Sequence, residues 1–308
     1  MNLSPDLAGP LSLSAPTLDH IAVRTAELGE GLAIGRALPT RQRRMVGAWC
    51  FLDHLGPVDL SGSQGMHVGA HPHTGLQTFT WMLEGQILHR DSLGSEQVIR
   101  PGQVHLMTAG RGIAHTEDSL PGASRLHAAQ LWIALPPDCA EVAPAFDHYP
   151  HLPAWTQDGV CCTLLAGAFA GHVAPTRLYS PLVGLDLASA QAGQTVLALE
   201  PGFEYALLPL EGRVHIGGEA FDARTLAYLG TGRASLGLGL EAGSRCLLLG
   251  GTPWEVPITM WWNFVGPSRA SIAQAQADWA AGSPRFGPVP GGEDRRLAAP
   301  PWPWGSAR

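Results

Sequence analysis

Lysine is absent from the 308 residues, so all 19 basic side chains are arginine. Acidic residues number 26, and the formal net charge is −7. Proteins that hold nucleic acid neutralise phosphates with clustered positive charge, so this balance argues against direct nucleic-acid binding. Charged residues make up only 15% of the chain and hydrophobic residues 45%, a composition that excludes a disordered protein.

Long hydrophobic runs and paired cysteines are missing as well. No apolar run reaches the roughly 18 residues of a membrane-spanning helix, so we expect no membrane partner. The first residues show no basic segment followed by an apolar core, the pattern of a secretory signal. The five cysteines are scattered, odd in number and without a C-x-x-C pair. These features predict a reduced, cytoplasmic protein rather than a disulfide scaffold.

Turn-forming residues, in contrast, are abundant. The chain has 38 glycines and 26 prolines, against an expectation of about 37 for the two types together. Apolar stretches of strand length recur between turn signals, as at 76–83, 104–107, 131–135 and 205–210. This punctuation predicts an all-β protein of sandwich or barrel type.

A proline-rich passage, 136–153, separates two β-rich parts and predicts a boundary near residue 150. We therefore expect domains at 1–150 and 151–308. Each part carries the turn Leu-Glu-Gly between two strands, at 83–85 and 210–212, which hints at a duplicated unit.

One helix is expected near the C-terminus. Ser271 and Gln274 have the spacing of a capping box, Ala-rich sequence follows to Ala281, and Gly282 and Pro284 supply the end. The proline-rich tail beyond it contains two tryptophans and is expected to pack back on a domain.

Histidine is the residue type that points to chemistry. Eight of the 13 histidines lie between His54 and His127, and two short motifs stand out, H-P-H at 71–73 and H-T-E at 115–117. In an extended chain residues i and i+2 point to the same face, so each motif presents two ligand-type side chains together.

Two such strands in one barrel would bring His71, His73, His115 and Glu117 to one point. Three imidazoles and one carboxylate suit a divalent transition metal, namely Fe, Mn, Ni, Cu or Zn, and leave open positions on a six-coordinate ion. Spacing alone leaves the alternative open that each pair is structural, with one histidine hydrogen-bonded and the other in water.

The sequence around these motifs resembles the pirin family of the cupin superfamily. The resemblance is carried by HPHTGLQTFTWMLEGQILHRDSLG (71–94) and IRPGQVHLMTAGRGIAHTED (99–118), and extends to 46–57, 130–133 and 260–287. It implies a bicupin, in which two β-barrels face each other with a few short helices. It also implies a single metal in the N-terminal barrel, usually Fe(II), held by His71, His73, His115 and Glu117.

An offset of 127 residues, which superposes the two Leu-Glu-Gly turns, puts Ala198 and Glu200 opposite the H-P-H histidines. The second barrel is therefore expected to be metal-free. Gln77 stands where the family commonly has a further glutamate, and strand parity from His73 would turn it toward the metal if Gly75 does not break the strand. Gln130 and His67 are further candidates for the substrate pocket. The other histidines of the 54–127 region, including His89, are expected to be structural.

The family resemblance supports two functions. The first is an oxidoreductase, a metal-dependent dioxygenase of the quercetinase type that cleaves a small aromatic or enolic substrate with O2, with Glu117 as ligand and base. The second is an iron-dependent redox sensor that binds a protein partner, such as a transcription factor or metabolic enzyme, without physiological turnover. The sequence does not separate them.

Overall fold

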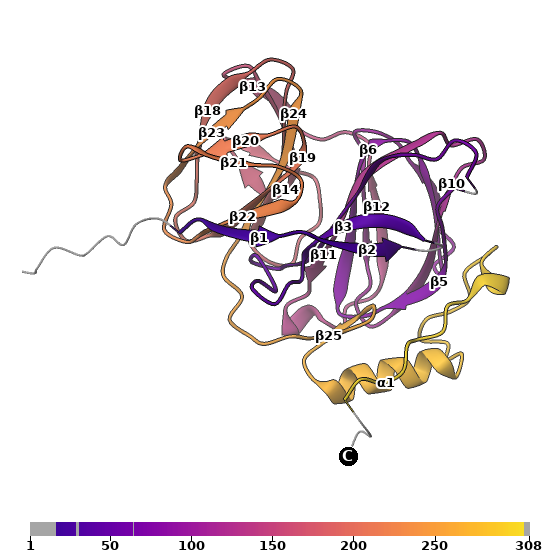
Figure 1. The fold of residues 1–308 in the computed structure, drawn as a ribbon. Coiled ribbons are helices and arrows are strands. Elements are labelled where there is room, and N and C mark those ends of the chain that lie inside the picture. Colours follow the sequence, from indigo (N-terminus) through magenta and orange to yellow (C-terminus); the bar gives the residue numbers. More distant parts are fainter. Residues whose placement is uncertain (1–16, 29–30, 64, 305–308) are drawn as a thin grey trace, which may run out of the picture.

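The computed structural model describes residues 17–28, 31–63 and 65–304. Strands dominate, and the described part contains a single α-helix, which lies beside the N-terminal half of the molecule (Figure 1). Each half is built from one seven-stranded and one four-stranded sheet. The expected all-β bicupin architecture is confirmed.

The N-terminal half pairs its strands in an order that differs from the chain order. Its large sheet runs β12 (Ala145–Tyr149), β9 (Val104–Thr108), β6 (Leu76–Glu84), β11 (Arg125–Ala134), β4 (Trp49–Asp59), β3 (Leu32–Leu38) and β2 (Arg24–Leu28). Its small sheet runs β5 (His67–His73), β10 (Ile113–Ser119), β7 (Ile87–Asp91) and β8 (Glu96–Ile99).

The second half repeats this plan. Its large sheet runs β1 (Asp19–Ala22), β22 (Thr225–Gly230), β19 (Glu204–Glu211), β24 (Ser244–Gly251), β17 (Leu182–Ser189), β14 (Val160–Ala166) and β13 (Ala154–Gln157). Its small sheet runs β18 (Gly193–Ala198), β23 (Ser235–Leu240), β20 (Val214–Ile216) and β21 (Glu219–Phe221). Two hairpins complete the strands, β15 (Ala168–Phe169) with β16 (His172–Val173) and β25 (Thr259–Trp261) with β26 (Phe264–Gly266).

The matching strand orders confirm the hint of a duplicated unit. β6 and β19 occupy equivalent places, and each leads through its Leu-Glu-Gly turn into the small sheet, at β7 and β20. The first strand of the described residues, β1, takes in the second large sheet the outer place that β12 has in the first. The N-terminal strand therefore belongs to the sheet of the C-terminal half.

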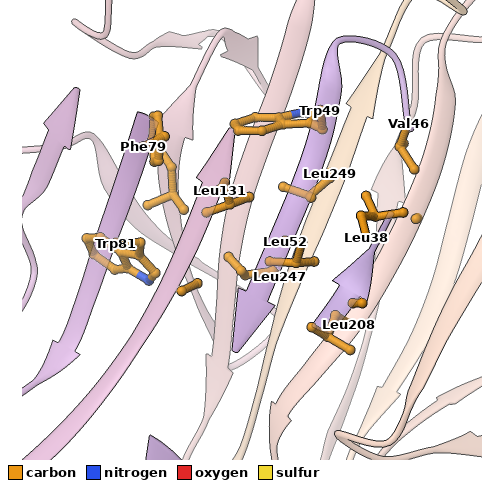
Figure 2. Close-up of a cluster of buried hydrophobic side chains, with 14 of the residues drawn as sticks. Leu38, Val46, Trp49, Leu52, Phe79, Trp81, Leu131, Leu208, Leu247 and Leu249 are labelled. Carbon is orange, nitrogen blue, oxygen red and sulfur yellow. The ribbon is translucent and has the colours of Figure 1, made fainter. Parts of the chain in front are cut away.

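The two large sheets face each other across a continuous apolar layer. Phe79, Trp81 and Leu131 of the first half meet Leu208, Leu247 and Leu249 of the second, all nearly fully buried (Figure 2). Two indole nitrogens are satisfied across the layer, since Trp49 Nε1 donates to the carbonyls of Val183 and Gly250 and Trp81 Nε1 to Asp186. Apolar burial at about 25 cal/mol per Å² makes this layer the main attachment between the halves.

Helix α1 spans Arg269–Ala280 and begins earlier than the predicted Ser271. Ser268 is the N-cap, its side chain accepts from the amide of Ser271, and the Ser271 hydroxyl completes the capping box. The predicted start was wrong because Ser268, three residues upstream, can cap the helix in the same way. Its partner in the capping box is the short side chain of Ser271 in place of the usual Glu or Gln. Two 3₁₀ helices, η1 (Pro137–Cys139) and η2 (Glu293–Arg295), complete the elements.

The chain after residue 258 lies against the N-terminal half. The amide of Val265 donates to the carbonyl of Thr74, and the amide of Leu297 donates to the carbonyl of Ala70 on β5. Trp302 and Trp304 are half-buried, with ring centroids 4.8 Å apart. The boundary at residue 150 stays a prediction. No helix of the described residues is long and apolar enough to cross a membrane.

Candidate metal centre and cavity

Strands β5 and β10 are antiparallel neighbours, and their register brings the two histidine motifs together. His115 lies opposite His71, and Ile113 lies opposite His73. The ring centroids of His71 and His115 are 4.3 Å apart, and the Nε2 atoms of His73 and His115 are 3.1 Å apart. The three imidazoles therefore converge, as the two-residue period predicted.

Each of the three rings is oriented through its Nδ1 atom. Nδ1 of His71 lies 2.8 Å from the carbonyl oxygen of Gly69, and Nδ1 of His73 lies 3.2 Å from that of Asn263. Nδ1 of His115 lies 3.3 Å from Nδ1 of His89. Because a carbonyl can only accept, His71 and His73 carry their proton on Nδ1 and present an unprotonated Nε2.

Burial keeps these imidazoles neutral. It lowers the pKa of His71 to about 4, and it lowers the pKa values of His73 and His115 well below the ordinary range, with a further contribution from the neighbouring histidines. A metal binds only the unprotonated ring, so the site is prepared for a cation at neutral pH.

Glu117 stands beside this triad. It is 8% exposed, and burial together with the charge of Asp118 raises its pKa to about 7. Two groups of residues each bring their ligand atoms within 4.8 Å of one another. The first consists of His71, His73 and His115, and the second of His89, His115 and Glu117. His115 belongs to both, so the carboxylate adjoins the triad at that residue.

The donor set fits a divalent transition ion. Adjacent ligands at about 2.1 Å from one octahedral ion lie about 3 Å apart, close to the 3.1 Å between His73 Nε2 and His115 Nε2. Neutral imidazoles with one nearby carboxylate are the ligands that such ions prefer. The cluster is thus capable of binding a metal.

A cavity of about 830 Å³ opens at the triad, and its wall includes the four ligand-type residues of the two motifs, three histidines and Glu117. Phe51 and Trp132 form one side as a stacked pair with centroids 4.1 Å apart, and the edge of Trp132 meets the ring of His73 at 5.3 Å. His67 and Gln130 also line the cavity, and their contact with a substrate stays a prediction. The Gln130 side-chain oxygen accepts from the hydroxyl of Thr80 at 2.8 Å.

Gln77 does not line this cavity. It is fully buried, and its amide nitrogen donates to the hydroxyl of Thr108 and to the carbonyl of Arg177 in the second half. The prediction for Gln77 required an unbroken strand and was wrong, because Gly75, with φ of +66°, separates β5 from β6 and resets the alternation of side chains. Gln77 therefore shares its face of β6 with Phe79 and Trp81, which pack in the layer between the halves.

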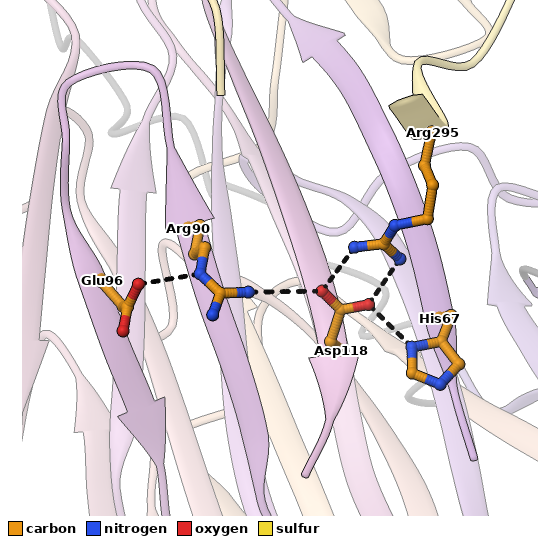
Figure 3. Close-up of polar contacts among 5 residues, drawn as sticks. All are labelled: His67, Arg90, Glu96, Asp118 and Arg295. Carbon is orange, nitrogen blue, oxygen red and sulfur yellow. Dashed lines mark hydrogen bonds and ion pairs between the residues drawn. The ribbon is translucent and has the colours of Figure 1, made fainter. Parts of the chain in front are cut away.

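The C-terminal segment completes the cavity, a contribution that sequence reasoning missed. Residues 260–263 and 295–297 form part of its wall. Arg295 holds Asp118 through two bonds of 2.7 and 2.9 Å, and Asp118 also binds Nδ1 of His67 at 2.8 Å and approaches Arg90, which pairs with Glu96 (Figure 3). Burial would raise the pKa of Asp118, but the bonds from Arg295 and His67 lower it.

The equivalent strands of the second half carry no such cluster. β18 and β23, which match β5 and β10, bury Leu197, Leu236, Leu238 and Leu240 in an aliphatic core. Both ligand groups found among the described residues lie in the N-terminal half.

Comparisons with known proteins agree with this geometry. The family described as Pirin matches residues 31–133, and the Pirin C-terminal cupin domain matches residues 184–287. A Pseudomonas aeruginosa protein with the provisional name quercetin 2,3-dioxygenase is 59% identical over 93% of this chain and 91% of its own. A pirin-like protein of Caulobacter vibrioides is 37% identical over 88% of this chain and 95% of its own.

Solved structures agree too. A crystal structure named quercetin 2,3-dioxygenase, from Acinetobacter baumannii, superposes with a TM-score of 0.92 at 46% identity and covers 94% of this chain and 97% of that one. The Escherichia coli pirin YhhW, solved with nickel(II), shares the fold with a TM-score of 0.61 at 19% identity, over 77% of this chain and 100% of that one. With both family domains matched and close relatives along nearly its whole length, this chain belongs to the pirin family.

Proposed function

We propose that this protein is a metal-dependent dioxygenase of the quercetin 2,3-dioxygenase type, which cleaves a flavonol-like or enolic substrate with O2. The observation that carries the proposal is the convergence of three neutral imidazoles beside Glu117 on the wall of an 830 Å³ cavity with an aromatic side. A cavity of this size holds a drug-sized ligand. The names of the Pseudomonas and Acinetobacter relatives support the same chemistry.

We assign His71, His73, His115 and Glu117 as the metal ligands and Fe(II) as the first candidate, with Mn, Ni, Cu or Zn as alternatives. The donor set suits all of these ions and leaves positions for other ligands. The bound metal would supply Lewis acidity toward a substrate oxygen and a centre for reaction with O2.

Glu117 is the proposed base. Burial raises its pKa to about 7 in the metal-free protein, and a bound cation would lower that pKa, so the carboxylate would be ionised and able to accept a substrate hydroxyl proton near neutral pH. Asp118, whose carboxylate is held by Arg295 and His67, stays ionised next to it. Two adjacent carboxyl groups with opposite pKa shifts are typical of a divided role, one in proton transfer and one in fixing the structure.

The other cavity residues would position the substrate. Phe51 and Trp132 present an apolar side that excludes water, and Gln130 and His67 offer polar contacts. The five cysteines are free thiols, which supports the proposed cytoplasmic location.

A second candidate is an iron-dependent redox sensor that binds a protein partner. The link between the triad and the C-terminal segment favours it, since Nδ1 of His73 reaches the carbonyl of Asn263 and Asp118 reaches Arg295. Through these bonds a change at the metal would reach segments near the surface.

Elemental analysis combined with aerobic turnover of quercetin tests the proposal. We expect about one metal per chain and a turnover that stops on chelation and returns with Fe(II). Metal without turnover of flavonols would favour the sensor, and a protein that takes up no metal would contradict both functions.

A further inference from the structure

We propose that His89 is a positioning residue that holds His115 for the metal and raises the basicity of its ring. The inference rests on the proposed metal centre but concerns a histidine outside the assigned ligands. His89 lies on β7, opposite Glu117 of β10, and is 3% exposed. It connects His115 to the buried carboxylate of Asp91, which has no other histidine partner among the described residues.

The hydrogen bonds form a chain of three side chains. Nδ1 of His115 lies 3.3 Å from Nδ1 of His89, and Nε2 of His89 lies 3.2 Å from Oδ2 of Asp91. Asp91 is fully buried, and its Oδ1 accepts from the amides of Leu93 and Ser95 at 2.9 and 3.0 Å. The carboxylate is therefore fixed by the turn that follows β7.

With a neutral His89 ring, a single proton assignment satisfies this chain. An ionised Asp91 can only accept, so Nε2 of His89 carries a proton and donates it. Nδ1 of His89 is then unprotonated and accepts from the Nδ1–H of His115. His115 is left with its free lone pair on Nε2, the atom that lies 3.1 Å from Nε2 of His73. The chain selects the tautomer of His115 that a metal requires.

Packing holds His89 in this orientation. Its ring stacks on Phe146 with centroids 4.4 Å apart and an interplanar angle of 14°. His71 and His73 are oriented by backbone carbonyls, whereas His115 depends on a side chain that passes on the charge of Asp91. A carboxylate behind a metal-ligating histidine raises the basicity of that ligand.

The alternative is that His89 itself binds a metal, in the group that it forms with His115 and Glu117. Both of its ring nitrogens already have partners, Nδ1 at His115 and Nε2 at Asp91. A positioning role uses both bonds, whereas ligation would break one of them.

Cobalt(II) binding to the metal-stripped full chain tests the inference, with affinity measured against a chromogenic chelator and ligand geometry followed by the visible absorption of the bound ion. His89→Leu removes both bonds, and we expect a loss of affinity of about 10–100-fold with a changed spectrum. His89→Asn keeps an acceptor near the position of Nδ1, so it should recover part of the affinity. The matched control is His105→Asn, because His105 is equally buried, lies 6.1 Å from His89 and also packs against Phe146.

The outcomes separate this inference from the proposed function. Wild-type affinity and spectrum in a folded His89→Leu, or an equal loss in His89→Asn and His105→Asn, would overturn the positioning role. A second equivalent of cobalt that disappears in His89→Leu would overturn it in favour of ligation by His89. A wild-type chain that binds no cobalt would instead remove the metal centre on which the proposed function depends.

Discussion

Glu117 and Asp118 are consecutive in the chain, yet their surroundings differ sharply. Glu117 has no arginine partner among the described contacts and its pKa rises to about 7, whereas Asp118 is held by Arg295 and has a lowered pKa. Successive residues of a strand point to opposite faces, so one carboxyl adjoins the histidines while the other reaches the C-terminal segment. The difference supports the separate roles proposed for the two residues.

Replacement of Glu117 by glutamine should separate binding from turnover. Three imidazoles remain, so Glu117→Gln should keep much of the metal. Loss of the base should lower turnover by about 10²–10⁴-fold. Elemental analysis and quercetin consumption by the same preparation check both statements.

Gln77→Ala is the comparison, since Gln77 lies outside the cavity and should leave kcat nearly unchanged. An active Glu117→Gln beside an inactive Gln77→Ala would show that the base has been assigned to the wrong residue.

Removal of one triad histidine should abolish tight metal binding. His71→Ala and His115→Ala each delete one of three converging nitrogens, and we expect less than one tenth of the wild-type metal after dialysis. His127→Ala is a suitable control, because His127 is also buried but pairs with His54, away from the triad. Full metal content in both triad variants would refute the ligand assignment.

The triad could be predicted from sequence because its logic is local. Residues two apart in a strand share a face, and Pro72 favours extended backbone. Gln77 was misplaced because Gly75, whose φ is positive, interrupts the strand, so the alternation of side chains does not continue from His73 to Gln77. The contact between His89 and His115 was missed, since nothing in the local sequence of His89 shows that β7 pairs with β10. Asn263 lies 190 residues from its partner His73, a contact that no local pattern reveals.

At the scale of elements, β5 is confined between β10 and the C-terminal segment. A Cβ atom on Gly69 would lie 2.0 Å from the carbonyl oxygen of Arg295. The same strand carries His71 and His73, and the amide of Leu297 binds Ala70 beside Gly69. The glycine thus permits the close approach that places the segment on the cavity wall.

Gly69→Ala should displace this segment and cost about 1–3 kcal/mol of unfolding free energy, the range for overpacking in a buried site. Urea denaturation measures the cost, and limited proteolysis after residue 290 reports the displacement. Gly237→Ala is the matched control, since Gly237 is also a strand glycine and a Cβ there meets no atom within 4 Å. Equal stability and equal protease resistance of the two variants would contradict the prediction.

Element boundaries were predicted unevenly. The apolar stretch 76–83 lies within β6, Leu76–Glu84, whereas the stretch 131–135 marks only the end of β11, which begins at Arg125. The earlier part of β11 includes His127 and Gln130, whose polarity concealed a strand buried between β4 and β6. A central strand can bury polar residues once they pair, as His127 does with His54.

At the scale of the molecule, several buried histidines make stability depend on pH. Burial lowers the pKa values of His54, His71 and His127 to about 4 and that of His105 to about 2. Between about 6.5 and these values the unfolded chain binds protons that the folded chain refuses, so stability falls as the pH falls.

The metal-free protein should therefore lose unfolding free energy between pH 6.5 and pH 4, with each such imidazole contributing about 1.4 kcal/mol per pH unit. Glu117, whose pKa is raised, opposes this trend between about pH 7 and 4.5, but it is one group against several. Urea titrations at pH 7.5, 6 and 5 in the presence of a chelator measure the slope. A constant free energy over this range would show that these rings are protonated in the folded state.

Strand β1 belongs to the sheet of the second half, and the C-terminal segment lies against the first half. This arrangement has a consequence for biosynthesis. β1 is synthesised about 200 residues before β22, yet its register pairs Ala22 with Thr225, so this strand must wait for the second half to emerge. The strands that carry His73 and Asp118 are synthesised well before their partners in the C-terminal segment, Asn263 and Arg295. A nascent chain that has not reached Asn263 therefore carries the histidine cluster without the carbonyl that orients His73. A product that ended before residue 260 would also lack the cavity wall that residues 260–263 and 295–297 provide.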